Sequence, residues 1–161
     1  METLTERLQT LLQVYDNVTS FSNTSNLLNL PSANVWAYII LKTTAAAPHP
    51  IHLHGHDFYL LASGTGTYDS SDLNLSNPPR RDVALLQADG YLVIGFKTDN
   101  PGAWLLHCHI GWHTAEGLAL QILERQDEIL DLIDYDALNS TCSTWTTYET
   151  DEDLVEDDSG I

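Results

Sequence analysis

The chain has 161 residues, enough for one domain with a single core, which excludes a large multidomain enzyme within these residues. Its hydrophobic content of 43% is ordinary for a globular protein, and no apolar run approaches the roughly 18 residues that cross a bilayer. The formal net charge of -17 argues against nucleic acid or an anionic membrane as a partner, because binding to phosphates requires lysine and arginine.

The first 30 residues contain no pattern that predicts a regular element. A short amphipathic start is followed by a polar stretch rich in Ser, Thr and Asn. The start METLTERLQTLL lacks the basic region, apolar stretch and small-residue cleavage site of a signal peptide. We therefore expect residues 1–30 to be a lead-in that holds a truncated start of the domain, and we expect no signal peptide in this chain.

The middle of the chain is a series of short segments rich in β-branched and aromatic residues, each bounded by turn residues. Six strands are predicted, over residues 35–42, 56–63, 82–87, 91–98, 103–108 and 117–124. No long helical period interrupts them. This pattern predicts an all-β fold, an antiparallel sandwich with Greek-key connections.

The end of the chain changes in both pattern and charge. Ile129, Leu132 and Ile133 recur at helical spacing, which predicts a helix over residues 126–148 that packs against the sandwich. No Lys or Arg follows Arg125, whereas 12 acidic residues lie between Asp127 and Asp158. We therefore expect residues 149–161 to form an acidic, solvated tail.

All seven histidines lie in two short windows. They are His49, His52, His54 and His56 in the first window, and His107, His109 and His113 in the second. Imidazole is the commonest metal ligand, and a metal centre commonly takes its ligands from two adjacent loops. The two windows therefore predict a metal site where they meet.

The spacing within each window sorts these residues into two sets of ligands. Side chains alternate along a strand, so Cys108 points away from the face that its neighbours His107 and His109 share. His113 follows His109 at helical spacing and can return beside the thiolate, while Pro50 bends the approach to His49. Two imidazoles and one thiolate form the trigonal set of a blue-copper site; the candidates are His49, Cys108 and His113. The others form an all-imidazole face suited to another copper centre: His52, His54, His107 and His109.

Three other interpretations compete with copper. The histidines could be structural, although their confinement to two windows argues against that as a complete account. A zinc hydrolase also uses His-x-His pairs after strands, but it leaves unexplained a cysteine between two histidines, and the order His56-Asp57 does not match its extended pattern. A disulfide between Cys108 and Cys142 would remove the thiolate from any metal site.

The stretches HPIHLHGHDF and HCHIGWHTAEGLALQILER resemble the two C-terminal copper signatures of multicopper oxidases. In detail they resemble the third cupredoxin domain of ascomycete-type laccases, over about residues 35–161. The resemblance implies a cupredoxin-like β-sandwich over residues 31–125, with a C-terminal helix and acidic tail over residues 126–161.

The same resemblance implies a role for each ligand. It assigns the type 1 copper to His49, Cys108 and His113, and the type 2 copper to His52. It assigns the type 3 pair to His54, His107 and His109. Leu118 falls where the family places its axial residue; leucine cannot coordinate, which favours a higher reduction potential than methionine does.

The resemblance further implies an enzyme that removes single electrons from phenols or aromatic amines. In the family these electrons pass from Cys108 to the adjacent catalytic ligands His107 and His109, and the trinuclear copper cluster then reduces dioxygen to water. That cluster needs four more histidines from an N-terminal cupredoxin domain, so the isolated chain is expected to be inactive. Three alternatives remain: a stand-alone blue-copper electron carrier, an inactive laccase fragment and a non-catalytic copper-binding module.

Two further features bear on assembly and location. A two-fold homodimer could supply the four-histidine face twice, although the charge of -17 on each chain opposes it. Glycosylation sequons lie at Asn17, Asn23, Asn74 and Asn139, and the family is secreted, which together predict a secreted glycoprotein.

Two segments near the end of the chain resemble functional features of the family. Cys142 resembles the cysteine that bridges to the N-terminal domain and would be unpaired here. The final residues, 158–161, resemble a C-terminus that enters the channel to the trinuclear site.

Overall fold

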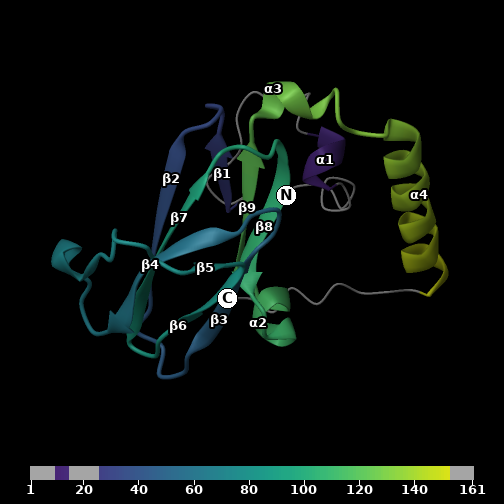
Figure 1. Cartoon of the computed structure of the whole chain (residues 1–161). Coiled ribbons are helices and arrows are strands. Elements are labelled where there is room, and N and C mark those ends of the chain that lie inside the picture. Colours follow the sequence, from purple (N-terminus) through teal and green to yellow (C-terminus); the bar gives the residue numbers. More distant parts are fainter. Residues whose placement is uncertain (1–9, 15–25, 153–161) are drawn as a thin grey trace.

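Two β-sheets face each other in a computed structural model that describes residues 10–14 and 26–152 (Figure 1). The first sheet has the strand order β1-β9-β8-β3-β6. Its strands are β1 (Leu27–Leu30), β3 (His49–Leu53), β6 (Val83–Leu86), β8 (Gly102–Cys108) and β9 (Ala119–Glu124). The second sheet has the order β2-β7-β4-β5. Its strands are β2 (Trp36–Lys42), β4 (Phe58–Thr65), β5 (Arg80–Arg81) and β7 (Gly90–Lys97). The prediction of an all-β sandwich is confirmed.

The helices are short except for the last one. They are α1 (Leu11–Val14), a 3-10 turn η2 (Ser70–Asp72), α2 (Gly111–Ala115), α3 (Gln126–Ile129) and α4 (Tyr135–Asp151). No helix in the described part of the chain is both long enough and apolar enough to span a membrane.

The core lies between the two sheets. Strand β7 is an inner strand of the second sheet, and every residue of β7 except Lys97 is buried. Leu92, Ile94 and Phe96 point between the sheets and pack with Phe58 and Ile122. Full burial of each such side chain contributes roughly 1.5–3 kcal/mol. Cys108 belongs to the same buried cluster, so this core encloses one of the candidate ligands.

A second, smaller core lies on the outer face of the first sheet. Leu123 of β9 packs there with Leu11 of α1 and Ile129 of α3. These helices cover one end of that face and leave its other end, where the last residues of β8 pair with β3, to the histidines described below. The 126–148 prediction is therefore correct for the packing of Ile129.

A C-terminal helix is present over most of the predicted range, but its start and its packing are wrong. Instead of one helix there are two, α3 and α4, and α4 buries no residue. It stands to one side of the sheets in Figure 1, with Trp145 and Tyr148 exposed. The reason lies in its composition: after Ile133 the apolar period ends, Asp134 caps a new helix, and threonines along α4 bond back to carbonyls four residues earlier.

The strand predictions need three corrections. Strand β1 lies within the lead-in and pairs parallel with β9, so the sandwich is not wholly antiparallel. This pairing covers the outer edge of β9, whose backbone groups would otherwise be unpaired. Strand β4 starts at Phe58 rather than residue 56, because the chain turns at Gly55, where φ is +74°. Strands β3, which carries His49 and His52, and β5 were not predicted.

Several predictions concern residues outside the described ranges. They are the signal-peptide prediction, the sequons at Asn17 and Asn23, the acidic tail from residue 153 onward and the role of residues 158–161. The predicted tail began at residue 149, but residues 149–151 are the last turn of α4, so that boundary is wrong.

Candidate metal centre

The pairing of β3 with β8 determines which side chains meet. His52 lies opposite His107 and Ile51 lies opposite Cys108 in the ladder. Because side chains alternate along both strands, the two histidines share the outer face of the sheet. Cys108 and Ile51 point the other way, into the core. The register therefore produces two ligand sets on opposite faces of one sheet.

The inner set brings together His49, Cys108 and His113. One ligand atom from each lies within 4.8 Å of the other two. The Cys108 Sγ is 3.5 Å from His113 Nδ1 and 3.8 Å from His49 Nδ1, and these two nitrogens are 3.1 Å apart. Helix α2 causes this approach, since its single turn after β8 carries His113 back over Cys108.

These distances fit a single metal ion. Three donors that share an ion at about 2.0–2.3 Å lie roughly 3–4 Å from one another. One thiolate and two imidazoles form the set that selects copper in a trigonal site. Cys108 is fully buried, and neither it nor Cys142 forms a disulfide. The disulfide interpretation is therefore wrong, and the thiol is available as a ligand.

The electrostatics of the inner set favour metal binding. Burial, and then the nearby His113, lower the pKa of His49 below its ordinary value. A lowered pKa keeps the imidazole neutral, which is the form that coordinates a metal.

Leu118 is held against the inner set by its backbone. The Cys108 N–H donates to the Leu118 carbonyl at 3.0 Å, and the Leu118 N–H donates to the His113 carbonyl at 2.8 Å. Leu118 also lines a surface hollow of about 480 Å³ with His49, His113 and Glu116. A molecule in this hollow would lie directly against the two imidazoles.

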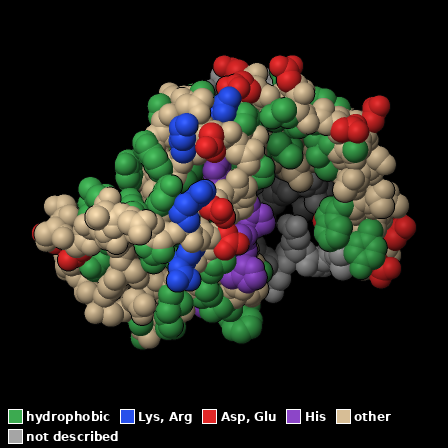
Figure 2. Space-filling view, viewed as in Figure 1, with side chains coloured by type: hydrophobic (Ala, Val, Ile, Leu, Met, Phe, Trp, Pro, Cys, Tyr) green, Lys and Arg blue, Asp and Glu red, His purple; other side chains and the backbone are tan. Residues whose placement is uncertain are grey.

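The outer set is a face of four histidines (Figure 2). His54 Nε2 and His107 Nε2 are 3.1 Å apart. The neighbouring rings have centroids 4.8 to 5.7 Å apart. Burial, and then charge on the other three rings, lower the pKa of His54, so this imidazole also stays neutral. The members of this face are His52, His54, His107 and His109.

Backbone oxygens orient two of these rings. His52 Nδ1 lies 2.8 Å from the Asp82 carbonyl, and His107 Nδ1 lies 2.8 Å from the Cys108 carbonyl. A carbonyl only accepts, so each Nδ1 carries the proton and each Nε2 carries the lone pair that can bind a metal. Such contacts orient metal-binding imidazoles. The Thr114 hydroxyl lies beside His107 and donates to the same Cys108 carbonyl.

The seventh histidine belongs to neither set. His56 points into the protein, where its Nε2 lies 2.8 Å from a carboxylate oxygen of Glu124. Sequence reasoning left His56 out of the ligand set, and the structure places it away from both ligand sets. Sequence reasoning missed the contacts that Asp82, Thr114 and Glu124 make with histidines. A contact through a backbone carbonyl, or with a partner far along the chain, leaves no local pattern in the sequence.

Comparison with known proteins points in the same direction. The sequence profile of the multicopper oxidase family matches residues 2–128. Laccase-2 of Botryotinia fuckeliana is 47% identical over 162 residues, which cover 94% of this chain and 28% of the relative. The laccase of Cryphonectria parasitica is 41% identical over 169 residues, covering 92% of this chain and 29% of the relative.

A solved structure gives the same result. The crystal structure of a laccase from Botrytis aclada superposes with a TM-score of 0.80 at 44% identity, covering 93% of this chain and 29% of that one. The chain thus spans less than a third of the length of the relatives it matches.

Copper-loaded protein is expected to absorb intensely in the visible range, because a thiolate ligand transfers charge to copper. Cys108→Ser should abolish this band, and Cys142→Ser, which changes the other free cysteine on α4, should leave it intact. Absorption spectra of the three proteins at equal copper content provide the measurement. A band that survives Cys108→Ser, or a colourless protein that prefers zinc, would contradict the assignment.

Leu118→Met is expected to lower the reduction potential of copper bound at Cys108, because a thioether ligand stabilises the oxidised ion. A drop of about 60 mV or more, equal to a tenfold change in the redox equilibrium, is expected in a redox titration of the visible band. Leu118→Ile is the control, since it changes shape without adding a ligand. Equal shifts in both variants would show that residue 118 acts only through packing.

Proposed function

Because this chain belongs to the multicopper oxidase family, we propose that it supplies the C-terminal copper-binding domain of a laccase-type oxidase. Such an enzyme oxidises phenols or aromatic amines and reduces dioxygen to water. The observation that carries the proposal is the tripeptide His107-Cys108-His109. Its cysteine lies with one ligand set and its two histidines lie with the other.

The proposed ligand roles follow the two sets. The inner set, His49, Cys108 and His113, is assigned to the type 1 copper, with Leu118 as its non-coordinating axial neighbour. On the outer face His52 is assigned to the type 2 copper. The type 3 pair is assigned to His54, His107 and His109. The donor distances of the inner set, and the Nε2 lone pairs that the backbone contacts of His52 and His107 leave for a metal, support these assignments.

Copper at the inner set would supply a one-electron acceptor for an aromatic reductant. The protein's part is to present and connect the ligands. His49 and His113 line the hollow that an aromatic ring would enter, and the exposed residue Glu116 lines the same hollow. From Cys108 the backbone leads directly to both His107 and His109, which makes this tripeptide the proposed electron path between the two sets.

The outer face holds half of the eight histidines that the family uses for its trinuclear cluster. We propose that the other four come from an N-terminal cupredoxin domain of the same longer polypeptide, so this chain alone should not reduce dioxygen. A two-fold dimer of this chain is the other way to reach eight. The charge of -17 on each copy opposes that dimer.

We also propose secretion and glycosylation. Two of the four sequon asparagines, Asn74 and Asn139, lie in the described part of the chain, and both are exposed.

The division into a lead-in (1–30), a cupredoxin domain (31–125) and a C-terminal segment (126–161) stays a prediction.

A chimera tests the proposed function. Replacing the matching segment of the Botryotinia fuckeliana Laccase-2 with this chain is expected to give an enzyme that consumes dioxygen and a phenol in the proportion that reduction to water requires. The measurement is oxygen uptake together with phenol loss. As a control, His107→Ala in the chimera should abolish oxygen uptake while the visible band persists. A folded chimera that shows this band but leaves dioxygen unchanged would refute the proposal.

A further inference from the structure

A buried carboxylate lies away from both ligand sets. Glu124, the last residue of β9, has no exposed surface, and the only other polar residue that is buried in the described part of the chain is Thr98. Glutamate is almost never fully buried unless it is paired, because leaving water is costly for a charge without hydrogen bonds. The contacts of Glu124 therefore reveal what the fold gains from it.

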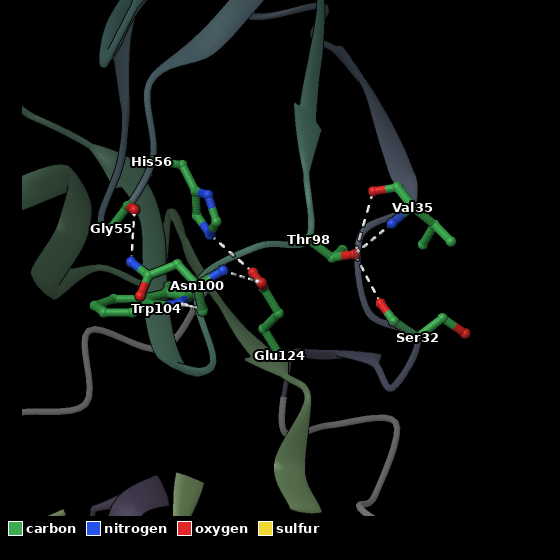
Figure 3. A network of polar contacts seen from close by, with 8 residues as sticks. All are labelled: Ser32, Val35, Gly55, His56, Thr98, Asn100, Trp104 and Glu124. Atoms are coloured by element: carbon green, nitrogen blue, oxygen red, sulfur yellow. Dashed lines mark hydrogen bonds and ion pairs between the residues drawn. The ribbon is translucent and has the colours of Figure 1, made fainter. Parts of the chain in front are cut away.

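Both oxygens of Glu124 are occupied (Figure 3). One lies 2.8 Å from His56 Nε2, and the other accepts from the backbone N–H of Asn100 at 2.8 Å. The Asn100 side chain in turn donates from Nδ2 to the Gly55 carbonyl at 2.8 Å. Glu124 thus holds His56 directly and Gly55 through Asn100.

Trp104 is the remaining member of this network. Its indole N–H donates to the Asn100 carbonyl at 2.8 Å, and its ring lies directly against Gly55. A Cβ atom on Gly55 would lie 2.5 Å from the Trp104 ring, and the positive φ of Gly55 also disfavours any side chain there. The turn is therefore fixed by packing as well as by hydrogen bonds.

This turn carries a member of the four-histidine face. His54 lies just beyond the end of β3, so the strand ladder fixes it less than it fixes His52. On one side the His54 N–H donates to the Leu105 carbonyl at 2.9 Å. On the other side of His54 lies Gly55, which the Asn100 side chain and the Trp104 ring hold in place. The Nε2 atoms of His54 and His107 are 3.1 Å apart.

We propose that Glu124 is a positioning residue for His54. Together with His56 and Asn100 it holds the turn at Gly55, and the turn keeps His54 close enough to His107 to share metal with it. The inference rests on the proposed function in one respect, that the four-histidine face binds copper.

Copper(II) titration of the full chain tests this inference. Copper at Cys108 is followed by the visible thiolate band. Copper at the four-histidine face is followed by its electron paramagnetic resonance signal, because copper without a thiolate ligand gives no such band. Loss of a residue that orients metal-binding imidazoles typically lowers metal affinity by about 10- to 100-fold. We expect that loss at the four-histidine face in Glu124→Ala and Asn100→Ala, with affinity at Cys108 unchanged. Glu124→Gln keeps an acceptor for the Asn100 N–H and should restore much of the affinity.

Thr98→Val is the matched control. The Thr98 hydroxyl is the other buried polar anchor in Figure 3; it donates to the Ser32 carbonyl at 2.7 Å and accepts from the Val35 N–H at 3.0 Å. Its loss should destabilise the fold and leave copper binding at the four-histidine face unchanged. Equal losses at both copper sites, or an equal effect of Thr98→Val, would overturn the inference, as would full affinity in Glu124→Ala and Asn100→Ala.

A second measurement needs no metal. In the metal-free chain, nuclear Overhauser contacts between the rings of His54 and His107 should be present in the parent and in Thr98→Val. They should be lost in Asn100→Ala, which leaves the buried carboxylate paired and is expected to fold. Contacts that persist in Asn100→Ala and in Glu124→Ala would overturn the positioning role. A parent chain that shows these contacts and binds no copper at the four-histidine face would instead refute the proposed function of that face.

Discussion

The alternation of side chains along β8 is the constraint on which the site depends. Neighbouring residues of a strand point to opposite faces, so Cys108 is buried between the sheets while His107 lies outside, opposite His52. Two ligand sets are therefore separated by the thickness of one sheet and are still joined by a single peptide bond. A helix or a loop could not separate covalent neighbours so sharply, because neither alternates residue by residue.

The rest of the sandwich makes this arrangement rigid. The core buries Cys108, which keeps its thiol from forming a disulfide, and the turn of α2 returns His113 to it. On the outer face, backbone carbonyls determine the orientation of His52 and His107. Imidazoles held by backbone oxygens and packed turns move little when a metal binds. The conformational entropy of these side chains is therefore lost largely on folding and not on metal binding.

Much of this was predictable from sequence because its signals are local. Strands such as β2 and β7 are rich in β-branched and aromatic residues, and the grouping of His49, Cys108 and His113 follows from alternation and one helical turn. The parallel pairing of β1 was not predictable, since four residues carry no period. The helix predicted over residues 126–148 was misjudged because the apolar pattern behind it ends at Ile133, before α4 begins. Glu124 lies 68 residues from His56, and only the folded sheet brings the two together.

X-ray absorption at the copper edge tests the central claim most directly, that one copper ion is held jointly by His49, Cys108 and His113. The chain loaded with a single equivalent of copper should show one sulfur neighbour and two imidazole nitrogens around the metal. A coordination shell made only of nitrogen and oxygen would contradict the account, because it would place the copper away from Cys108.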